Sequence, residues 1–110
     1  MFYIIFFEKE LQIDMVRHMI IWKLNDNASS TCKQEIKTAL EGLVGVIDGL
    51  VEMHILTEPF ECSSGDVAMD SLFESKEALE YYQSHPKHVE IASTLVRPNV
   101  SLRLSFDCEA

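Results

Sequence analysis

Residues 16–24 constrain the fold more than any other stretch of this 110-residue chain. They read Val-Arg-His-Met-Ile-Ile-Trp-Lys-Leu and alternate as a β-strand does, with successive side chains on opposite faces. One face carries Val16, His18, Ile20, Trp22 and Leu24, and the other carries Arg17, Met19, Ile21 and Lys23. Because both faces have apolar centres, both should be covered, so helices on one side of the sheet cannot be the whole structure.

The spacing of apolar residues in the rest of the chain predicts one further helix and three further strands, apart from the broken helical region described next. Apolar residues recur at helical spacing through Ile36, Leu40, Leu43, Val44 and Ile47, which predicts a helix over about 31–46, with Thr31 and Gln34 as a capping box. Residues 50–57, 66–73 and 100–106 alternate as strands.

The second helical region is broken at residues 82–88, Tyr-Gln-Ser-His-Pro-Lys-His. Ser75 is placed to cap a helix that should stop near Ser84, because a residue before proline is pushed out of helical geometry. Pro86 suits the first position of a new helix, which should run to about residue 96.

The order strand, helix, strand, strand, helix, strand predicts a ferredoxin-like βαββαβ fold: a four-stranded antiparallel sheet with both helices on one face. Two such sheets packed face to face would cover the bare side, giving a homodimeric α+β barrel. Residues 15–110 form this one domain, and residues 1–14 are interpreted as an N-terminal extension, such as a start assigned upstream of Met15 would produce. An edge strand is the alternative for residues 1–14.

The composition excludes several classes of partner. A net charge of −9 argues against nucleic acid and anionic membrane surfaces, which bind clustered Lys and Arg. The apolar start of the chain is far shorter than the roughly 20 residues that a membrane span needs. Cys32, Cys62 and Cys108 lack metal-binding spacing and are predicted to be free thiols in the cytoplasm. No motif indicates a metal or a cofactor.

Three polar residues are candidates for a site beneath the broken helix. Tyr82 could orient a carbonyl or donate a proton, and His88, in the first turn after Pro86, should be neutral and able to act as a general base. His18 shares its strand face with Ile20 and Trp22, and would join Tyr82 and His88 if that face meets the helices. Alternatively, all three are core residues whose polar atoms find local partners.

Four stretches together resemble the stress-responsive A/B barrel domain family, a branch of the dimeric α+β barrel superfamily. They are residues 16–24, the segment Phe-Glu-Ser at 73–75 followed by Ala78-Leu79, the Tyr-x-x-His-Pro-x-His pattern at 82–88, and Val-Arg-Pro at 96–98. The resemblance spans about residues 15–107. It implies the dimeric barrel fold and a link to stress responses, while many members of the family have no known activity.

One plant polyketide cyclase of this family uses a Tyr and a His as acid and base beside a pocket between sheet and helices. The resemblance places these roles on Tyr82 and His88, and a first-strand His on His18. The third strand departs from such a site, because Asp66, Asp70 and Ser71 make it more polar than a polyketide pocket wall.

Three functions therefore stay open at this stage. The first is a homodimer that binds a small apolar or aromatic molecule through His18, Ile20, Trp22, Tyr82 and His88. The second is a cofactor-independent cyclase or monooxygenase-like enzyme, with His88 as base and Tyr82 as the orienting acid. The third is a structural dimer whose only role is assembly.

Overall fold

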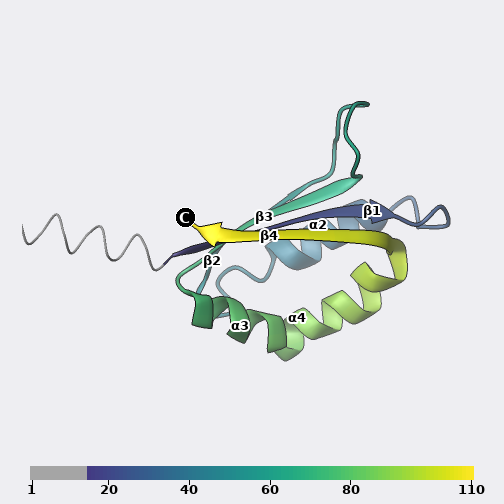
Figure 1. Cartoon of the computed structure of the whole chain (residues 1–110). Helices are drawn as coiled ribbons and strands as arrows, with labels where there is room; N and C mark the ends of the chain where they lie inside the picture. The colour runs from purple at the N-terminus through teal and green to yellow at the C-terminus, as the bar shows by residue number, and fades with distance from the viewer. Residues whose placement is uncertain (1–14) are drawn as a thin grey trace, which may run out of the picture.

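A computed structural model describes residues 15–110, so the interpretation of residues 1–14 as an extension lies outside the described residues. The elements follow the predicted order of strands and helices (Figure 1). They are β1 (Val16–Leu24), α2 (Cys32–Glu41), β2 (Leu50–Leu56), β3 (Val67–Phe73), α3 (Lys76–Ser84), α4 (Pro86–Ile91), a π-helical turn (Ala92–Val96), a 3-10 turn (Arg97–Asn99) and β4 (Val100–Glu109).

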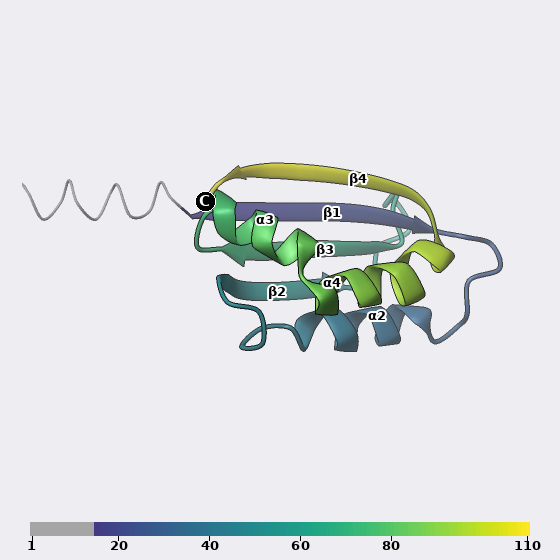
Figure 2. The ribbon, with the colours of Figure 1, turned by 90° about the horizontal axis from the view of Figure 1, so that it is seen from below.

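The sheet is antiparallel throughout and has the strand order β2-β3-β1-β4. Figure 1 shows α3 and α4 below the sheet, and Figure 2, seen from below, shows α3 and α4 in front of its strands and α2 alongside β2. This is the predicted ferredoxin-like α+β fold. β1 lies centrally and pairs Ile20 with Met69 of β3 and with Ser105 of β4, so one face of all three strands meets the helices.

The core lies between the sheet and the helices. Ile36 and Leu40 of α2 pack with Phe73 of β3 and Leu79 of α3, all of them buried. Helix α2 ends earlier than predicted, at Glu41, and Val44 is exposed because the chain beyond Glu41 forms turns and the helical spacing no longer applies.

The predicted capping box at the start of α2 is wrong. The Thr31 side chain makes no capping hydrogen bond to the helix backbone, and its hydroxyl instead donates to the Glu35 carboxylate at 2.7 Å. By contrast, Ser75 caps α3 as predicted, accepting a hydrogen bond from the Ala78 N–H at 3.0 Å.

Gly49 lets the chain enter β2 close beneath α3. Its φ is +88°, in the left-handed region that side chains disfavour. A Cβ on Gly49 would lie 2.6 Å from the Cβ of Ala78, so there is also no space for a side chain at this position. Gly45 has a φ of +83°, but a Cβ there would meet no atom within 4 Å. Of these two positive-φ glycines, only Gly49 therefore marks a close approach of the helical layer to the sheet.

The break between α3 and α4 forms where Pro86 predicts it. His85 is extended, with φ −66° and ψ 133°, and its imidazole accepts a hydrogen bond from the Lys87 N–H at 3.1 Å. The second half of the predicted helix over 86–96 is a π-helical turn rather than an α-helix. The break bends the helical layer as it crosses beneath the sheet.

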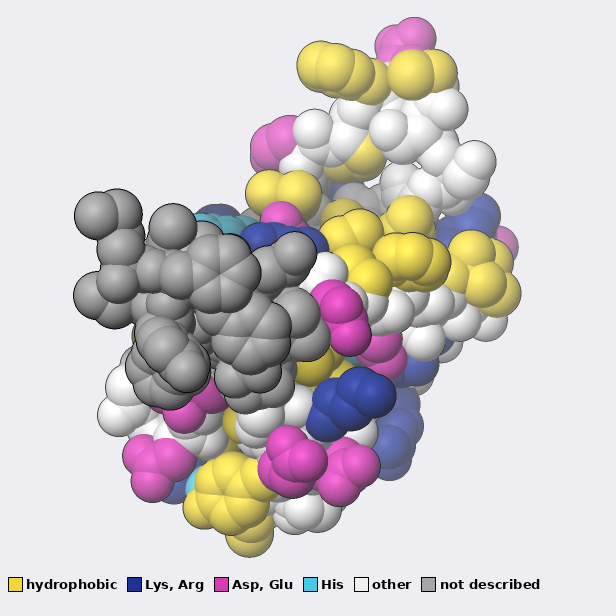
Figure 3. Space-filling view, turned by 60° about the vertical axis from the view of Figure 1, so that its left-hand side comes forward, with side chains coloured by type: hydrophobic (Ala, Val, Ile, Leu, Met, Phe, Trp, Pro, Cys, Tyr) yellow, Lys and Arg dark blue, Asp and Glu magenta, His cyan; other side chains and the backbone are white. Residues whose placement is uncertain are grey.

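The other face of the sheet has no helix over it among residues 15–110. Met19, Ile21, Leu104 and Phe106 are all exposed there, with Phe106 62% exposed. Figure 3 shows hydrophobic side chains gathered below the β2–β3 loop, which rises from this face. We call this surface the open face.

Helix α2 also covers part of the outer edge of β2. The Glu41 carboxylate accepts a hydrogen bond from the Ile55 N–H at 2.9 Å, and the Lys37 ammonium donates to the Ile55 carbonyl oxygen at 2.9 Å. Lys37 and Glu41 are joined to each other at 2.8 Å. The pair thus satisfies one donor and one acceptor of the edge strand.

The cysteines are free thiols, as predicted: Cys32 is buried, Cys62 exposed and Cys108 half-buried. Among residues 15–110, no helix combines the length and the apolar character needed to cross a bilayer.

Candidate functional site

A cavity of about 360 Å³ lies between the sheet and the bent helical layer. All five residues that the sequence predicts as ligand-binding line it, brought together from β1, α3 and α4. The full lining is His18, Ile20, Trp22, Leu40, Met69, Tyr82, Gln83, His88, Ala92, Val96, Arg97 and Arg103. We call it the helix-side cavity.

Tyr82 is 1% exposed and packs its ring against Phe73, with ring centroids 5.0 Å apart. Its hydroxyl is buried and has no hydrogen-bond partner among residues 15–110. Burial raises the pKa of this phenol far above its ordinary value, so Tyr82 is protonated at neutral pH and can donate a hydrogen bond.

Trp22 presents a second donor of the same kind. It is 3% exposed, and its indole Nε1–H is buried without a partner in the described part of the chain. Buried polar groups in folded proteins are almost always hydrogen-bonded, and each exception calls for an explanation. Both residues line the helix-side cavity, and neither buried atom has a protein partner among residues 15–110.

His88 stacks on Tyr82, with ring centroids 4.2 Å apart and planes inclined by 35°. Its Nδ1 lies 3.3 Å from the carbonyl oxygen of Gln83, which can only accept a hydrogen bond. This contact places the proton on Nδ1 and leaves Nε2 as the basic nitrogen. Burial is the largest cause and lowers the pKa of the His88 imidazole, the hydrogen bond to Gln83 raises it, and the positive charges of Arg97 and Arg103 are smaller causes that lower it. The predicted neutral imidazole is therefore favoured, with burial rather than the helix terminus as the main cause.

His18 is buried, and its Nδ1 contacts the carboxylate of Asp107 on β4. The Ser71 hydroxyl donates to the backbone oxygen of His18 at 2.6 Å, which ties this part of β1 to β3. His18, Tyr82 and His88 thus line one cavity, as predicted. No hydrogen bond within residues 15–110 links the three side chains to one another, so they do not form a relay.

Arg97, Arg103 and Asp107 are site residues that the sequence reasoning did not identify. Arg103 lies opposite Trp22 and Asp107 opposite His18 in the β1–β4 register. The signal was present in β4, where an apolar set (Leu102, Leu104 and Phe106) alternates with a polar one. Once the apolar set is assigned to the open face, the polar set must face the helices.

The predicted polar wall of the pocket is not formed, since Asp66, Asp70 and Ser71 all lie outside the cavity lining. Asp70 points to the open face and pairs with Arg17 at 2.7 Å. Its register partner is Met19, which explains why both share that face. β3 instead contributes Met69 to the cavity wall, so this wall is apolar.

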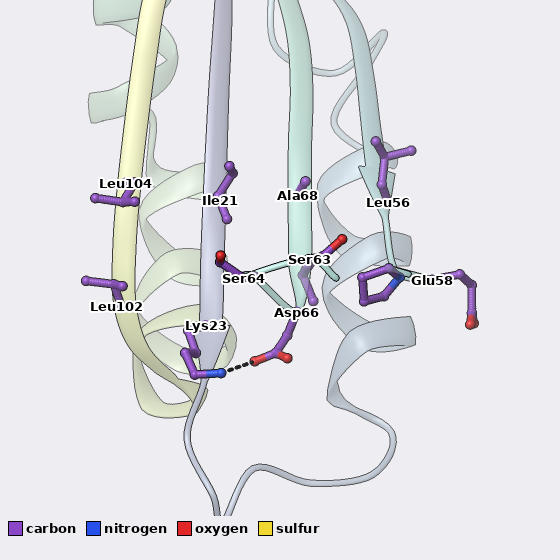
Figure 4. Close-up of a pocket in the computed structure, with 13 residues that line it drawn as sticks. Ile21, Lys23, Leu56, Glu58, Ser63, Ser64, Asp66, Ala68, Leu102 and Leu104 are labelled. Atoms are coloured by element: carbon purple, nitrogen blue, oxygen red, sulfur yellow. Dashed lines mark ion pairs between the residues drawn. The ribbon is translucent and has the colours of Figure 1, made fainter. Parts of the chain in front are cut away.

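A second cavity, of about 500 Å³, lies on the open face under the β2–β3 loop. Figure 4 shows Ile21, Ala68 and Leu104 lining its floor, with an ion pair between Lys23 and Asp66 at one end. It has no buried polar atom without a partner in the described range, and it is open to the side that lacks helices.

Neither cavity suits a metal ion. Within residues 15–110 there is no group of three or more His, Cys, Asp or Glu side chains placed to hold one. The helix-side cavity instead combines two free hydrogen-bond donors, one basic nitrogen and an apolar wall.

Comparison with known proteins identifies the family. The model of the stress responsive A/B barrel domain matches residues 16–110. A stress-response A/B barrel domain-containing protein of Arabidopsis thaliana is 32% identical over 91 residues, which cover 79% of this chain and 34% of the relative. The chain thus spans about a third of the length of that relative.

Solved structures share the fold. A dimeric ferredoxin-like protein of unknown function from Thermobifida fusca superposes with a TM-score of 0.79 at 20% identity, covering 91% of this chain and 94% of that one. A hydroxynitrile lyase from Passiflora edulis superposes with a TM-score of 0.76 at 16% identity, covering 89% and 94%. At these identities, the likeness establishes the fold alone.

Proposed function

The chain belongs to the stress-responsive A/B barrel domain family, and on that premise we propose that it binds a small apolar or aromatic molecule in the helix-side cavity. The observation that carries this proposal is the pair of buried, unpartnered donors, the Tyr82 hydroxyl and the Trp22 indole N–H, which have no partner within residues 15–110. A cavity of about 360 Å³ is within the range of small-molecule sites, roughly 300–1,000 Å³.

The apolar share of the lining supports a ligand with a hydrophobic body. Ile20, Leu40, Met69 and Val96 form the walls, while the free donors come from Trp22 on β1 and Tyr82 on α3. An apolar body would bury its surface against these walls, and a single acceptor could satisfy the donors. In a purely structural role, ordered water would have to satisfy both donors.

Trp22 is the only tryptophan of the chain, so its indole N–H resonance is a unique reporter of the cavity. We expect members of a library of small aromatic compounds to shift this resonance saturably. Ala92→Phe should abolish the shifts because Ala92 lines the cavity. Ser93→Phe, at the adjacent exposed position, is the matched control and should keep them. If no compound shifts the resonance at millimolar concentration, the binding proposal is wrong.

We propose further that the active form is a homodimer formed through the open face. The exposed apolar side chains of β1 and β4 support this, since a patch of sheet size is rarely left bare in a monomer. The Thermobifida fusca relative is described as dimeric. A second copy of the same sheet would cover Ile21, Leu104 and Phe106 at once and would extend over the open-face cavity.

A second candidate function is cofactor-independent catalysis on a carbonyl compound, of the cyclase or monooxygenase-like kind. The specific observation in its favour is the neutral His88, with Nε2 left basic, stacked on a Tyr82 whose hydroxyl has no partner in the described range. His88 would remove a proton from carbon next to a carbonyl, and Tyr82 would donate a hydrogen bond to the developing oxyanion.

This candidate can be tested without knowing the natural substrate. The protein is incubated in D₂O with 2-tetralone, an aromatic ketone with acidic C–H bonds, and deuterium uptake is followed by NMR. An enzyme of this kind should accelerate exchange, and His88→Ala should reduce the acceleration by ~10²-fold. His85→Asn, which removes a neighbouring imidazole outside the cavity and keeps a capping acceptor, should leave it unchanged. Equal exchange with and without protein would favour the binder.

The three free thiols support a cytoplasmic setting, and residues 15–110 are proposed as the functional domain.

A further inference from the structure

We propose that the ligand of the helix-side cavity is a small aromatic carboxylate, held by Arg97, Arg103 and the free donors of Trp22 and Tyr82. This inference rests on the proposed binding function and adds the chemical class of the ligand.

The charge of the cavity is opposite to that of the chain. Asp and Glu outnumber Lys and Arg by 18 to 9 over the whole sequence. The cavity lining nevertheless includes no carboxylate, and its permanent charges are the guanidinium groups of Arg97 and Arg103, while the Asp107 carboxylate contacts His18 beside it. Two like charges at one small cavity, in a chain this acidic, favour an anion there.

These two arginines are also free to bind. Arg17 forms an ion pair with Asp70 at 2.7 Å on the open face. Arg97 and Arg103 form neither an ion pair nor a side-chain hydrogen bond with any residue in the range 15–110. Both line the cavity, and their positive charges contribute to lowering the pKa of the His88 imidazole.

Several polar groups of the cavity are donors, beside the basic Nε2 of His88. An indole N–H and a guanidinium can only donate, and Tyr82, protonated at neutral pH, is available to donate through its hydroxyl. A carboxylate is the complementary group, because it only accepts and offers about four lone-pair positions on two oxygens. A neutral carbonyl has one oxygen and would leave some of these donors unpaired.

The rest of the cavity sets the body of the ligand. Ile20, Leu40, Met69, Ala92 and Val96 provide the apolar part of its wall. The rings of Tyr82 and His88, packed on each other, add aromatic residues to this wall. A volume of about 360 Å³, near the lower end for small-molecule sites, suits a body of one or two fused rings.

The test compares two probes of the same shape and different charge, 2-naphthoate and its neutral amide, 2-naphthamide. Affinities are measured by isothermal titration calorimetry near neutral pH, and the Trp22 indole resonance reports where each probe binds. We expect the wild-type protein to bind the carboxylate roughly tenfold more tightly than the amide, or better, since hydrogen bonds to a charged acceptor are the stronger kind. Added salt should reduce this preference.

The double variant Arg97→Gln/Arg103→Gln should remove the preference and leave the amide affinity within about threefold of wild type. Both arginines are exposed, so the fold should be retained, which the backbone amide spectrum checks. The double variant Lys76→Gln/Lys87→Gln is the control for net charge, because it also removes two positive charges and both lysines lie outside the cavities described above. It should keep the full preference.

Each other outcome has a definite meaning. Equal affinities of wild-type protein for the two probes would overturn the carboxylate assignment and leave the binding function standing. A preference that survives in the double variant would show that the arginines do not hold the anion, which also overturns it. If neither probe shifts the Trp22 resonance, the carboxylate assignment fails, and the library of neutral compounds then decides whether the binding function fails with it.

Discussion

The two faces of the sheet each carry a cavity, and the cavities differ in kind. The open-face cavity is the larger, at about 500 Å³ against 360 Å³, and its floor is apolar. The helix-side cavity is smaller and includes the buried donors of Trp22 and Tyr82, which have no partner among residues 15–110. The open face therefore has exposed apolar surface that a partner could cover, whereas the helix side has buried donors that lack a hydrogen-bond acceptor in the described residues.

This difference teaches what kind of partner each face needs. Exposed apolar surface can be buried by any apolar surface of matching shape, and a second sheet of the same size would be large enough to cover it. A buried donor is relieved only by an acceptor within hydrogen-bond distance, which a small molecule can bring into an enclosed space.

The largest effect is expected from placing a charge on the open face. Ile21→Asp should weaken dimer formation by ~10³-fold or more, about 4 kcal/mol, because each subunit would bury an unpaired carboxylate. Sedimentation over a concentration series measures this directly. Val44→Asp, at an exposed site outside the sheet, is the control and should leave the dimer intact. A dimer unchanged in Ile21→Asp would show that the open face is not the interface.

Next in size is the close contact between the sheet entry and the helical layer. Gly49→Ala should destabilise the fold by about 2 kcal/mol or more, through a positive φ and a clash with Ala78. Gly45→Ala carries the same backbone strain without the clash, so the difference between the two variants in urea unfolding isolates the contact. Dimerisation measured at low denaturant should be unaffected. Equal losses in the two variants would mean that α3 shifts to admit the methyl group.

Removing one free donor should separate stability from binding. Tyr82→Phe is expected to stabilise the ligand-free protein by about 1 kcal/mol, because a buried unpaired hydroxyl is lost, and to weaken carboxylate binding roughly tenfold. Tyr81→Phe, at an exposed position on the same helix, should change neither quantity. The two measurements are thermal unfolding and calorimetry. A Tyr82→Phe protein that is less stable would indicate that the hydroxyl already has a partner.

The smallest expected effect is a dependence of folding stability on pH that arises from His88 on the helix side. Burial holds the folded-state pKa of His88 below that of the unfolded chain, so protonation favours unfolding. The contribution of neutral His88 to stability is full above the ordinary histidine pKa of about 6.5 and declines as pH falls below it. Comparing wild type with His88→Gln in urea titrations across this window should show a loss in wild type alone. A bound carboxylate should oppose the loss, since it stabilises the charged imidazole.

Most of the fold was predictable because local signals agree with the tertiary structure. Pro86 forces the break between α3 and α4, Ser75 caps α3, and the alternation of β1 assigns its two faces. The exceptions have physical causes. The periodicity around Val44 continues past the end of α2, since a turn can contain apolar residues without being helical. Thr31 bonds to Glu35 instead of capping, which depends on side-chain geometry that the spacing does not determine.

The site was predictable only in part, because it depends on strand register. His18, Tyr82 and His88 stand out by residue type and share a cavity with Ile20 and Trp22. Arg103 and Asp107 reach the same region only through the pairing of β4 with β1. The same dependence misled the interpretation of Asp70, whose face follows from its pairing with Met19. Function stays a proposal, since neither register nor fold identifies a ligand.

The hydrogen bonds of Lys37 and Glu41 to Ile55 also protect one edge of the sheet against pairing with another molecule. A sheet grows by adding strands at an unprotected edge, and amyloid-like association begins there. At β2 the backbone donor and acceptor of Ile55 are already occupied by the two side chains of α2. An incoming strand from another molecule would have to displace both side chains, which disfavours strand addition at β2. The other edge strand of the sheet is β4, and strand addition is expected there instead.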